Sequence, residues 1–404
     1  MVVNCRNCGV SELSVLWHLK DAPYGDLFRS EKNLALETQK SIFRVASCNN
    51  CELLQLADLT NIEYQYDNYL YKTSITVGLN SYYAMVAESL FNSYLQPSSR
   101  VLDIGSNDGS FLTHFKSKGM EVLGIEPSSL AGKEAANLGI PTIRNYFSSE
   151  LAKQLIEERH YVADLITINY TLANVSNVLD VLNGIESILS DEGVVSIITG
   201  YHPDQFAVNM FDYIGHDHLV YFSLSTLIKC CENANLKVID AIRSENKGGS
   251  IQVIASKSTS NLSAQSRVQQ ILQREQWTWS DNANIFELQS RILTVESKVR
   301  ESLSALDTKV LGIGASISTS YLINQFSLSE FISHLVDDDI SKVGKFSPYY
   351  GLEVISFSNH LIQQCDTALI LAWQHTNVLL NRLRTVGFKG RVLVPLPDIK
   401  WIEL

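Results

Sequence analysis

The chain has 404 residues, of which 45% are hydrophobic and 19% charged, and its formal net charge is −11 at pH 7. This composition excludes a disordered or fibrous protein, and the length predicts two or three domains. The negative charge argues against nucleic acid or an anionic membrane surface as the main partner. No apolar run approaches the ~20 residues of a membrane-spanning helix, and the first ten residues do not resemble a signal peptide. We therefore expect a cytoplasmic protein whose cysteines are metal ligands or buried thiols.

Two CxxC pairs stand near the N-terminus, Cys5-Arg-Asn-Cys8 and Cys48-Asn-Asn-Cys51. The two-residue gap in each pair lets both thiolates reach one tetrahedral Zn²⁺ at about 2.3 Å. Four sulfur ligands leave no open coordination position, so the predicted zinc is structural rather than catalytic. We assign residues 1–75 to an N-terminal zinc-binding domain.

An alternation of strands and helices begins near residue 100, after an expected helix over roughly 79–95. Short β-branched runs predict strands at 100–104, 122–125, 141–146, 165–170, 194–199, 238–242 and 251–255. Such runs, separated by helical segments, indicate a mainly parallel sheet with helices on both faces. We assign residues 76–260 to this central Rossmann-like domain.

The last third of the chain contains a helical connector and a second, smaller α/β unit. Residues 261–305 are polar, with Ile, Leu and Val at helical spacing, and predict the connector. Expected strands at 310–313, 331–336, 367–371 and 392–394 then predict a Rossmann-like domain over residues 306–404. The overall fold class is therefore α/β.

The segment Val101-Leu-Asp-Ile-Gly-Ser-Asn-Asp-Gly109 follows a strand, opens a helix and resembles motif I of class I methyltransferases. Gly105 lets the backbone approach a ligand, and Asp103 at the strand end can hold an ammonium group. Glu126 ends the next strand, where a carboxylate accepts hydrogen bonds from ribose hydroxyls. Since an NAD-binding loop would read GxGxxG, the GxNxG pattern favours S-adenosylmethionine. The predicted cofactor-binding residues are Asp103, Gly105, Ser106, Asn107, Glu126 and Asn169.

Residues 211–218 follow the fifth strand of this sheet and contain His216-Asp217-His218. Ligands bind α/β sheets at their carboxyl edge, where this segment should lie. In an extended segment the two histidines would share one face, with Asp217 opposite. The residues alone allow a metal site, a base with an orienting carboxylate, or a structural role.

Taken together and in this order, these features resemble the three-domain sugar C-methyltransferases that act on nucleotide-linked 4-keto-deoxysugars. The resemblance covers essentially the whole chain. Its parts are the paired CxxC, Tyr69-Leu-Tyr-Lys-Thr-Ser74, the cofactor loop, residues 211–218, Lys247-Gly-Gly-Ser-Ile251, Gly312-Ile-Gly-Ala315, Leu371-Ala-Trp373 and Val392-Leu-Val-Pro395.

The resemblance implies that S-adenosylmethionine is the methyl donor and a nucleotide-linked sugar the substrate. A histidine at the position of His218 is the family's base, which removes the proton beside the ketone to give an enolate. An acidic residue matches Asp217, and a tyrosine matches Tyr71. The C-terminal domain is expected to help hold the nucleotide-sugar. The oligomeric state stays open.

The sequence departs from the family pattern at three places. Gly215 stands where a tyrosine is usual, Asn174 where histidine is frequent, and Gly314-Ala-Ser-Ile-Ser318 lacks a frequent lysine. O- or N-methylation of a related sugar or metabolite therefore remains an alternative, as does a binding protein with a vestigial cofactor site. A dehydrogenase using Gly312-Ile-Gly314 is disfavoured, because no carboxylate is expected at the matching strand end in a GxGxxG context.

Overall fold

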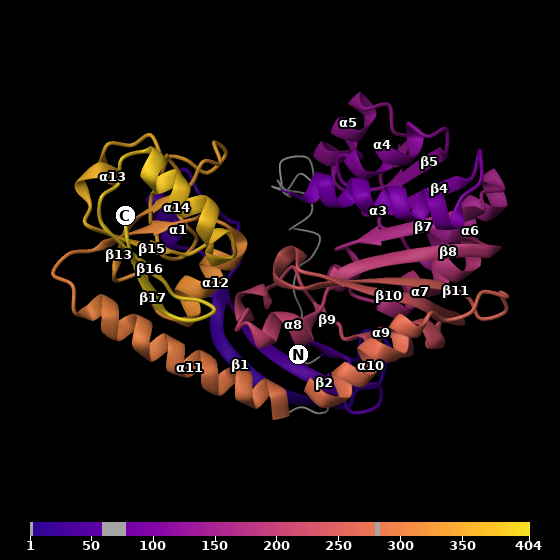
Figure 1. Ribbon diagram of the computed structural model, residues 1–404, viewed down its shortest axis with the longest axis horizontal. Helices are drawn as coiled ribbons and strands as arrows, with labels where there is room; N and C mark the ends of the chain where they lie inside the picture. Colours follow the sequence, from indigo (N-terminus) through magenta and orange to yellow (C-terminus); the bar gives the residue numbers. More distant parts are fainter. Residues whose placement is uncertain (1–2, 59–77, 279–282) are drawn as a thin grey trace.

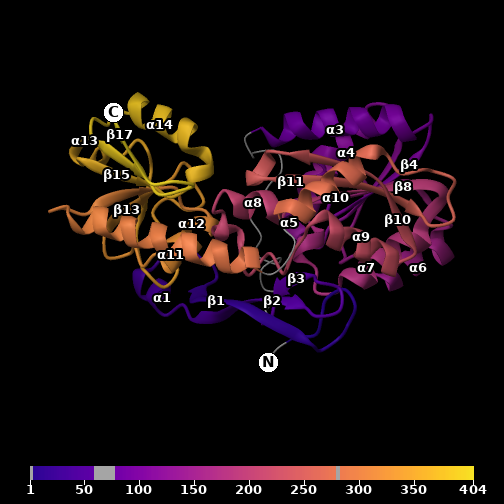
Figure 2. The same cartoon turned by 60° about the horizontal axis from the view of Figure 1, so that its bottom comes forward.

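The computed structural model describes residues 3–58, 78–278 and 283–404. These residues form three β-sheets, of four, seven and six strands. The seven-stranded and six-stranded sheets, each with its helices, lie side by side, and the long N-terminal strands run beneath both (Figures 1 and 2). No helix of the described residues is long and apolar enough to cross a membrane.

The N-terminal sheet has the order β1-β2-β3-β9 and is antiparallel throughout. Its strands are β1 (Leu13–Pro23), β2 (Lys40–Cys48), β3 (Leu54–Leu56) and β9 (Val220–Tyr221), and α1 (Lys32–Leu36) joins the first two. β9 comes from the central part of the chain, immediately after the histidine segment. The N-terminal sheet is thus completed by residues that lie more than 160 positions away in the sequence from β3, as the bounds of the two strands show.

The central sheet has the order β10-β11-β8-β7-β4-β5-β6, in which only β11 is antiparallel to its neighbours. The strands are β4 (Arg100–Ile104), β5 (Glu121–Ile125), β6 (Thr142–Ile143), β7 (Ala163–Asn169), β8 (Leu189–Gly200), β10 (Leu236–Ser244) and β11 (Ser250–Lys257). All seven predicted strands are present. The strand predicted at 141–146 is only two residues long, because the Asn145 N–H turns back to the Ile143 carbonyl.

Helices cover the central sheet on both faces. They are α3 (Leu79–Tyr94), α4 (Ser110–Lys116), α5 (Ser129–Asn137), α6 (Ser149–Arg159), α7 (Val178–Ile188), α8 (His202–Ala207) and α9 (Leu224–Asn233). Polar side chains begin several of them: Ser128, Ser148 and Asn177 each accept a hydrogen bond from a backbone N–H three residues ahead. These caps satisfy amides that the first helical turn leaves unpaired.

Two helices, α10 (Ser266–Thr278) and α11 (Ala283–Ser304), occupy the predicted connector. α11 buries a stripe at helical spacing, made of Ile285, Leu288, Ile292, Val295, Val299 and Leu303. This helix packs against β1 and leads into the C-terminal domain.

The C-terminal sheet has the order β14-β13-β12-β15-β16-β17, parallel except for the last strand. Its strands are β12 (Val310–Ile313), β13 (Ile332–Val336), β14 (Val354–Ile355), β15 (Thr367–Ile370), β16 (Arg391–Val394) and β17 (Lys400–Glu403), with helices α12 (Ile317–Gln325), α13 (Leu361–Gln364) and α14 (Thr376–Thr385). This is the doubly wound order of nucleotide-binding folds. The predicted α/β fold class is confirmed.

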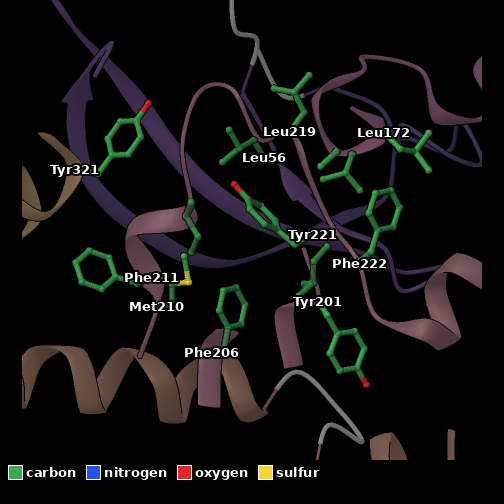
Figure 3. Packing of buried hydrophobic residues seen from close by; sticks show 14 of the residues in the cluster. Leu56, Leu172, Tyr201, Phe206, Met210, Phe211, Leu219, Tyr221, Phe222 and Tyr321 are labelled. Atoms are coloured by element: carbon green, nitrogen blue, oxygen red, sulfur yellow. The ribbon is translucent and has the colours of Figure 1, made fainter. Parts of the chain in front are cut away.

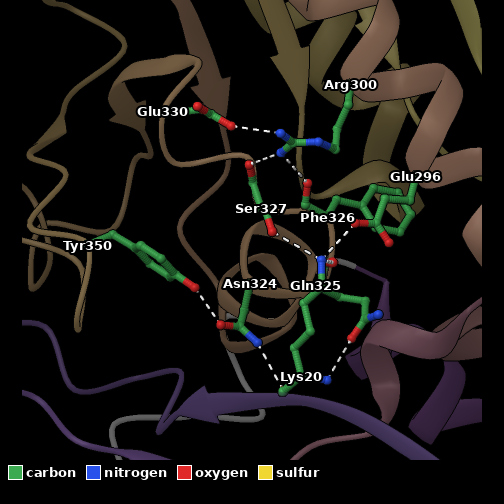
Figure 4. A network of polar contacts seen from close by, with 9 residues as sticks. All are labelled: Lys20, Glu296, Arg300, Asn324, Gln325, Phe326, Ser327, Glu330 and Tyr350. Atoms are coloured by element: carbon green, nitrogen blue, oxygen red, sulfur yellow. Dashed lines mark hydrogen bonds and ion pairs between the residues drawn. The ribbon is translucent and has the colours of Figure 1, made fainter.

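Polar contacts join β1 to the C-terminal domain. The Lys20 ammonium donates to Glu296 Oε1 at 2.7 Å, to the Gln325 carbonyl and to Ser327 Oγ (Figure 4). The Lys20 carbonyl accepts from Asn324 Nδ2 at 3.1 Å. These contacts fix β1 to the end of α12, whose Asn324 and Gln325 lie more than 300 residues away along the chain.

A buried cluster joins all three sheets. Figure 3 shows part of it: Leu56 from the N-terminal sheet, Phe211 and Tyr221 from the central region and Tyr321 from α12 lie in the same core. Beside it, the buried Asp212 carboxylate accepts hydrogen bonds from Trp373 Nε1 at 3.0 Å and Gln374 Nε2 at 3.2 Å. The segment before the two histidines is therefore held by both flanking domains.

Candidate active site

A cavity of about 510 Å³ lies at the carboxyl ends of β4, β5 and β7. Its lining includes all six predicted cofactor-binding residues together with Asp217 and His218. Ile317, at the start of α12, brings the C-terminal domain to the same cavity. The carboxyl edge of a doubly wound sheet is the usual ligand site of such folds. Tyr71 lies outside the described residues.

Glu126 links two loops at the rim of the sheet. Its Oε2 accepts a hydrogen bond from the Asn107 N–H at 2.9 Å, and its Oε1 accepts from the Ser128 N–H at 2.8 Å. Burial raises the pKa of this carboxyl, and the two amides oppose that rise. Each carboxylate oxygen has further lone pairs, so Glu126 can also accept from a pair of ligand hydroxyls.

Asp103 is buried at the end of β4, where Thr167 Oγ donates to its Oδ1 at 2.6 Å and Asn169 Nδ2 lies 3.4 Å from the same atom. Burial raises the pKa of Asp103 to about 7. A cationic ligand group beside it would restore the charged form, because an opposite charge favours ionisation. The site suits an ammonium group.

The cofactor loop depends on Gly105, whose φ is +73°. A Cβ at this position would lie 2.2 Å from Thr171 Oγ, so a larger residue cannot fit without moving the neighbouring loop. Asn107, two residues on, also has a left-handed backbone (φ +49°). The loop is thus shaped for close approach of a ligand to its backbone.

His218 lies in the same cavity, with its ring stacked on Tyr213 at a centroid distance of 3.9 Å. Its Nδ1 lies 3.4 Å from Asp217 Oδ1. Burial lowers the pKa of His218; the Asp217 carboxylate raises it and the positive charge of Lys247 lowers it further. The imidazole is therefore neutral at pH 7 and can accept a proton.

His216 does not share this environment. The segment forms a turn in which the His218 N–H donates to the Gly215 carbonyl at 3.0 Å, so the extended arrangement considered from the sequence is wrong. His216 is fully buried, stacked on Tyr24 and edge-on to Phe43. Only Asp217 and His218 face the cavity, which removes the two-histidine metal site from consideration.

Gly215 stands where the family usually has a tyrosine, and Tyr321 of α12 packs beside it. A Cβ on Gly215 would lie 2.5 Å from the ring of Tyr321. The Tyr321 hydroxyl accepts from the His216 N–H at 3.1 Å and lies 3.2 Å from His216 Nδ1. The space next to residue 215 is thus filled by a side chain of the C-terminal domain, which buttresses the turn.

Among the cavity residues that the sequence did not single out as site residues are Tyr213 and Lys247. Lys247 was noticed only as part of a Lys-Gly-Gly-Ser motif, and the paired glycines after it were the available signal. Reasoning also missed Asp337, which directly follows β13 and accepts a hydrogen bond from the Ala315 N–H at 2.7 Å. The strand next to the Gly312-Ile-Gly314 loop therefore does end in a carboxylate, contrary to the expectation from the sequence, although the loop lacks the GxGxxG spacing.

The four predicted cysteine ligands lie close together beside the turn between β2 and β3. All four sulfur atoms lie within 4.8 Å of one another, and the Cys5–Cys51 and Cys8–Cys48 pairs are each 3.5 Å apart. Four thiolates at about 2.3 Å from one tetrahedral ion would stand about 3.8 Å apart. The donor set and its spacing therefore fit a closed tetrahedral metal site.

Comparison with known protein families gives two matches, which together cover most of the chain beyond residue 80. Residues 80–241 match a methyltransferase domain and residues 245–397 match the C-methyltransferase C-terminal domain. The second match begins before β11, which structurally belongs to the central sheet. The C-methyltransferase NovU of Streptomyces niveus is 26% identical over 99% of this chain and 96% of its own length.

Solved structures resemble about half of the chain. An S-adenosylmethionine-dependent methyltransferase from Clostridium acetobutylicum is 12% identical with a TM-score of 0.36, covering 48% of this chain and 97% of that one. Magnesium protoporphyrin IX methyltransferase from Synechocystis, with bound S-adenosylhomocysteine, is 14% identical with a TM-score of 0.36, covering 45% and 84%. Its cofactor-type cavity, its two matched domains and a C-methyltransferase similar to it over nearly its whole length identify this chain as an S-adenosylmethionine-dependent methyltransferase.

Proposed function

We propose that this protein methylates the carbon beside the ketone of a nucleotide-linked deoxysugar, with His218 as the base. The observation that carries the proposal is the single cavity that contains His218, its partner Asp217 and the cofactor residues Asp103 and Glu126. A base and a methyl donor in one cavity are what alkylation of a carbon acid requires.

In the proposed reaction the neutral imidazole of His218 takes the proton from the carbon next to the carbonyl. The electron pair of the broken C–H bond forms a carbon–carbon double bond, and the carbonyl π pair moves to oxygen, which gives an enolate. Asp217 orients the ring and stabilises the imidazolium that forms, since its Oδ1 lies 3.4 Å from Nδ1. Bound S-adenosylmethionine supplies an electrophilic methyl group for the enolate carbon.

The cofactor would be held by the residues at the sheet edge. Asp103 suits its ammonium group, Glu126 its ribose hydroxyls, and Gly105 leaves room for it beside the loop. Ser106, Asn107 and Asn169 complete this set. We also keep the proposal that Tyr71 contributes to the active site.

We propose that the C-terminal domain holds the nucleotide part of the substrate. Support comes from its doubly wound sheet, from the turn at Gly314 with φ +113°, and from Ile317, which reaches the cavity. The chain would be organised as units 1–75, 76–260, 261–305 and 306–404, with β9 contributed to the first sheet by the second unit.

We propose that the four cysteines bind one structural Zn²⁺ in a protein that works in the reducing cytoplasm. The sulfur spacing and the absence of an open ligand position support a structural rather than catalytic ion. Around the cysteines, Gln55 Oε1 accepts from the Arg6 N–H at 2.8 Å, which ties the first knuckle to β3.

The test is a screen of nucleotide-linked 4-keto-deoxysugars with labelled S-adenosylmethionine, with NMR of the product. We expect the methyl on carbon, and we expect His218→Asn to bind the cofactor normally while losing methyl transfer by about 10²-fold or more. The wild type should exchange the substrate's α-proton with deuterium from solvent when S-adenosylhomocysteine is bound, and His218→Asn should not.

His360→Asn, at an exposed position of the C-terminal domain, is the matched control and should behave as wild type. His216→Asn is unsuitable as a control, because His216 is buried among aromatic rings of two domains. A product methylated on oxygen or nitrogen, with no exchange at carbon, would replace the enolate reaction by the alternative of simple O- or N-methylation.

A further inference from the structure

Among the described residues, three cavity residues other than glycine have left-handed backbones: Asn107 (φ +49°), Tyr170 (φ +54°) and Lys247 (φ +49°). This conformation costs free energy for residues with a Cβ, and it persists where the surroundings impose it. Such positions cluster at functional sites. Asn107 is already explained by the cofactor loop, whereas Lys247 has no role in the reaction as described so far.

Close packing imposes the backbone conformation at Lys247. Gly248 and Gly249 follow it with φ of +75° and +131°. A Cβ at these positions would lie 2.2 Å from Met210 Sδ and 2.7 Å from the Cβ of Asp204, so both must be glycine. Gln205 Nε2 donates to the Lys247 carbonyl at 3.2 Å. The turn between β10 and β11 is therefore closely packed, and it presents one lysine to the cavity.

The ammonium group of Lys247 has a defined place. Its Nζ lies 4.0 Å from the ring centroid of Tyr170, a cation–π contact. The Tyr170 hydroxyl lies 3.0 Å from Ser250 Oγ, which in turn donates to the Asn246 carbonyl at 2.7 Å. The aromatic ring that holds the lysine is thus itself anchored to the start of β11.

The charge balance of the cavity singles this lysine out. In the part of the chain that the structure describes, the carboxylates lining it are those of Asp103, Glu126, Asp180 and Asp217. Among the described residues of the lining, Lys247 is the only lysine or arginine. An enolate forming among four carboxylates needs a cation close to its oxygen, because fixed donors aimed at a developing oxyanion lower the barrier most.

We propose that Lys247 is a catalytic residue whose ammonium contacts the substrate carbonyl oxygen and stabilises the negative charge that develops there as His218 removes the α-proton. The inference rests on the proposed carbon methylation. The proton leaves carbon for the imidazole of His218, and the electron pair ends on the oxygen that faces Lys247. The lysine keeps its own protons throughout.

Lys247→Met tests this, because methionine has similar length, no charge and the same backbone requirement. Lys247→Arg restores a cation, and Lys257→Met, at the far end of the strand β11 that follows the Lys247 turn, is the matched control. For Lys247→Met we expect unchanged S-adenosylmethionine affinity and a loss of kcat of about 10²- to 10³-fold. Its α-proton exchange should fall in parallel, Lys247→Arg should recover part of both, and Lys257→Met should match wild type.

The pH profile supplies an independent readout. The charged groups that act on His218 are Asp217, which raises its pKa, and Lys247, which lowers it. Removing the lysine charge in Lys247→Met should therefore move the acid limb of the kcat/KM profile to higher pH, whereas Lys247→Arg, which keeps the positive charge, should leave that limb in place.

The outcomes separate the two proposals. If the wild type exchanges its α-proton and Lys247→Met exchanges equally fast, the role of Lys247 is refuted while carbon methylation stands. A higher KM for the nucleotide-sugar with unchanged kcat would likewise overturn it, since the lysine would then bind substrate phosphate. If the wild type itself shows no exchange and methylates oxygen, the proposed function fails instead.

Discussion

Replacing Glu126 by alanine should weaken both the fold and the binding of the cofactor. The Glu126 carboxylate accepts from two backbone amides, at 2.9 and 2.8 Å, and its side chain is buried. Hydrogen bonds to a charged group contribute about 1.5–3 kcal/mol each, and an unpaired buried amide costs about 1–3 kcal/mol. Since the Asn107 amide borders a cavity that water can enter, we expect a loss near the lower end, about 2–4 kcal/mol in the free energy of unfolding.

The effect on binding comes in addition. In the proposed binding mode, removing the carboxylate leaves two ribose hydroxyls without a charged acceptor, which costs roughly 1.5–3 kcal/mol, or about tenfold to a hundredfold in Kd. Release of the Asn107 amide also loosens the cofactor loop. Glu126→Gln should be milder in both respects, because its amide oxygen can still accept one of the two backbone N–H groups.

Glu121→Ala is the matched control. Glu121 begins the same strand β5, but its side chain is 64% exposed and its partner is Arg100 at 3.1 Å. Exposed ion pairs contribute at most about 1 kcal/mol, so this variant should bind the cofactor as wild type does. Denaturant unfolding measures the first quantity and calorimetry with S-adenosylmethionine the second. Unchanged cofactor affinity in Glu126→Ala would refute the ribose assignment.

Three further predictions address the metal, the pH and the loop. Purified protein should contain about one Zn²⁺ per chain, and Cys8→Ser should loosen the N-terminal region while the cofactor still binds; metal analysis that finds no zinc in protein prepared without chelators would contradict this. Because burial raises the pKa of Asp103 to about 7, the free protein loses its carboxylate charge below that pH, so affinity for S-adenosylmethionine should fall by up to tenfold per pH unit on acidification. Calorimetry from pH 5.5 to about 7.5 tests this, and Asp103→Asn should bind weakly with a flat profile. Gly105→Ala should lose cofactor affinity and about 1–2 kcal/mol or more of stability, because its Cβ would meet Thr171. Gly119→Ala, with φ +82° and open space around it, carries the backbone strain alone, and equal effects in the two variants would show that the contact with Thr171 is unimportant.

Local chemistry was sufficient for several parts of this protein. β4 and β12 have the bounds predicted from their apolar runs, because a strand buried in a parallel sheet needs a short continuous β-branched segment. Asp103, Gly105 and Glu126 were identified from the motif I resemblance and the end of the next strand, and they line one cavity because the turn after one strand and the end of the next meet at the same sheet edge. The cysteine cluster was also predicted from the sequence, because the geometry of a tetrahedral metal site requires the two-residue gap within each pair.

Only the tertiary structure decided which of the two histidines, His216 or His218, lines the cavity. His216 and His218 have the same type of side chain two residues apart, yet one is packed against Tyr24 and Tyr321 and the other lines the cavity. Those packing partners lie about 105 residues or more away in the chain and belong to other domains. The same holds for Lys247, which becomes part of the site because Gly248 and Gly249 fit against Met210 and Asp204. No hydrophobic periodicity in the sequence predicts the placement of the two histidines or of Lys247. Both placements depend on contacts between segments that meet only after the three sheets have packed together.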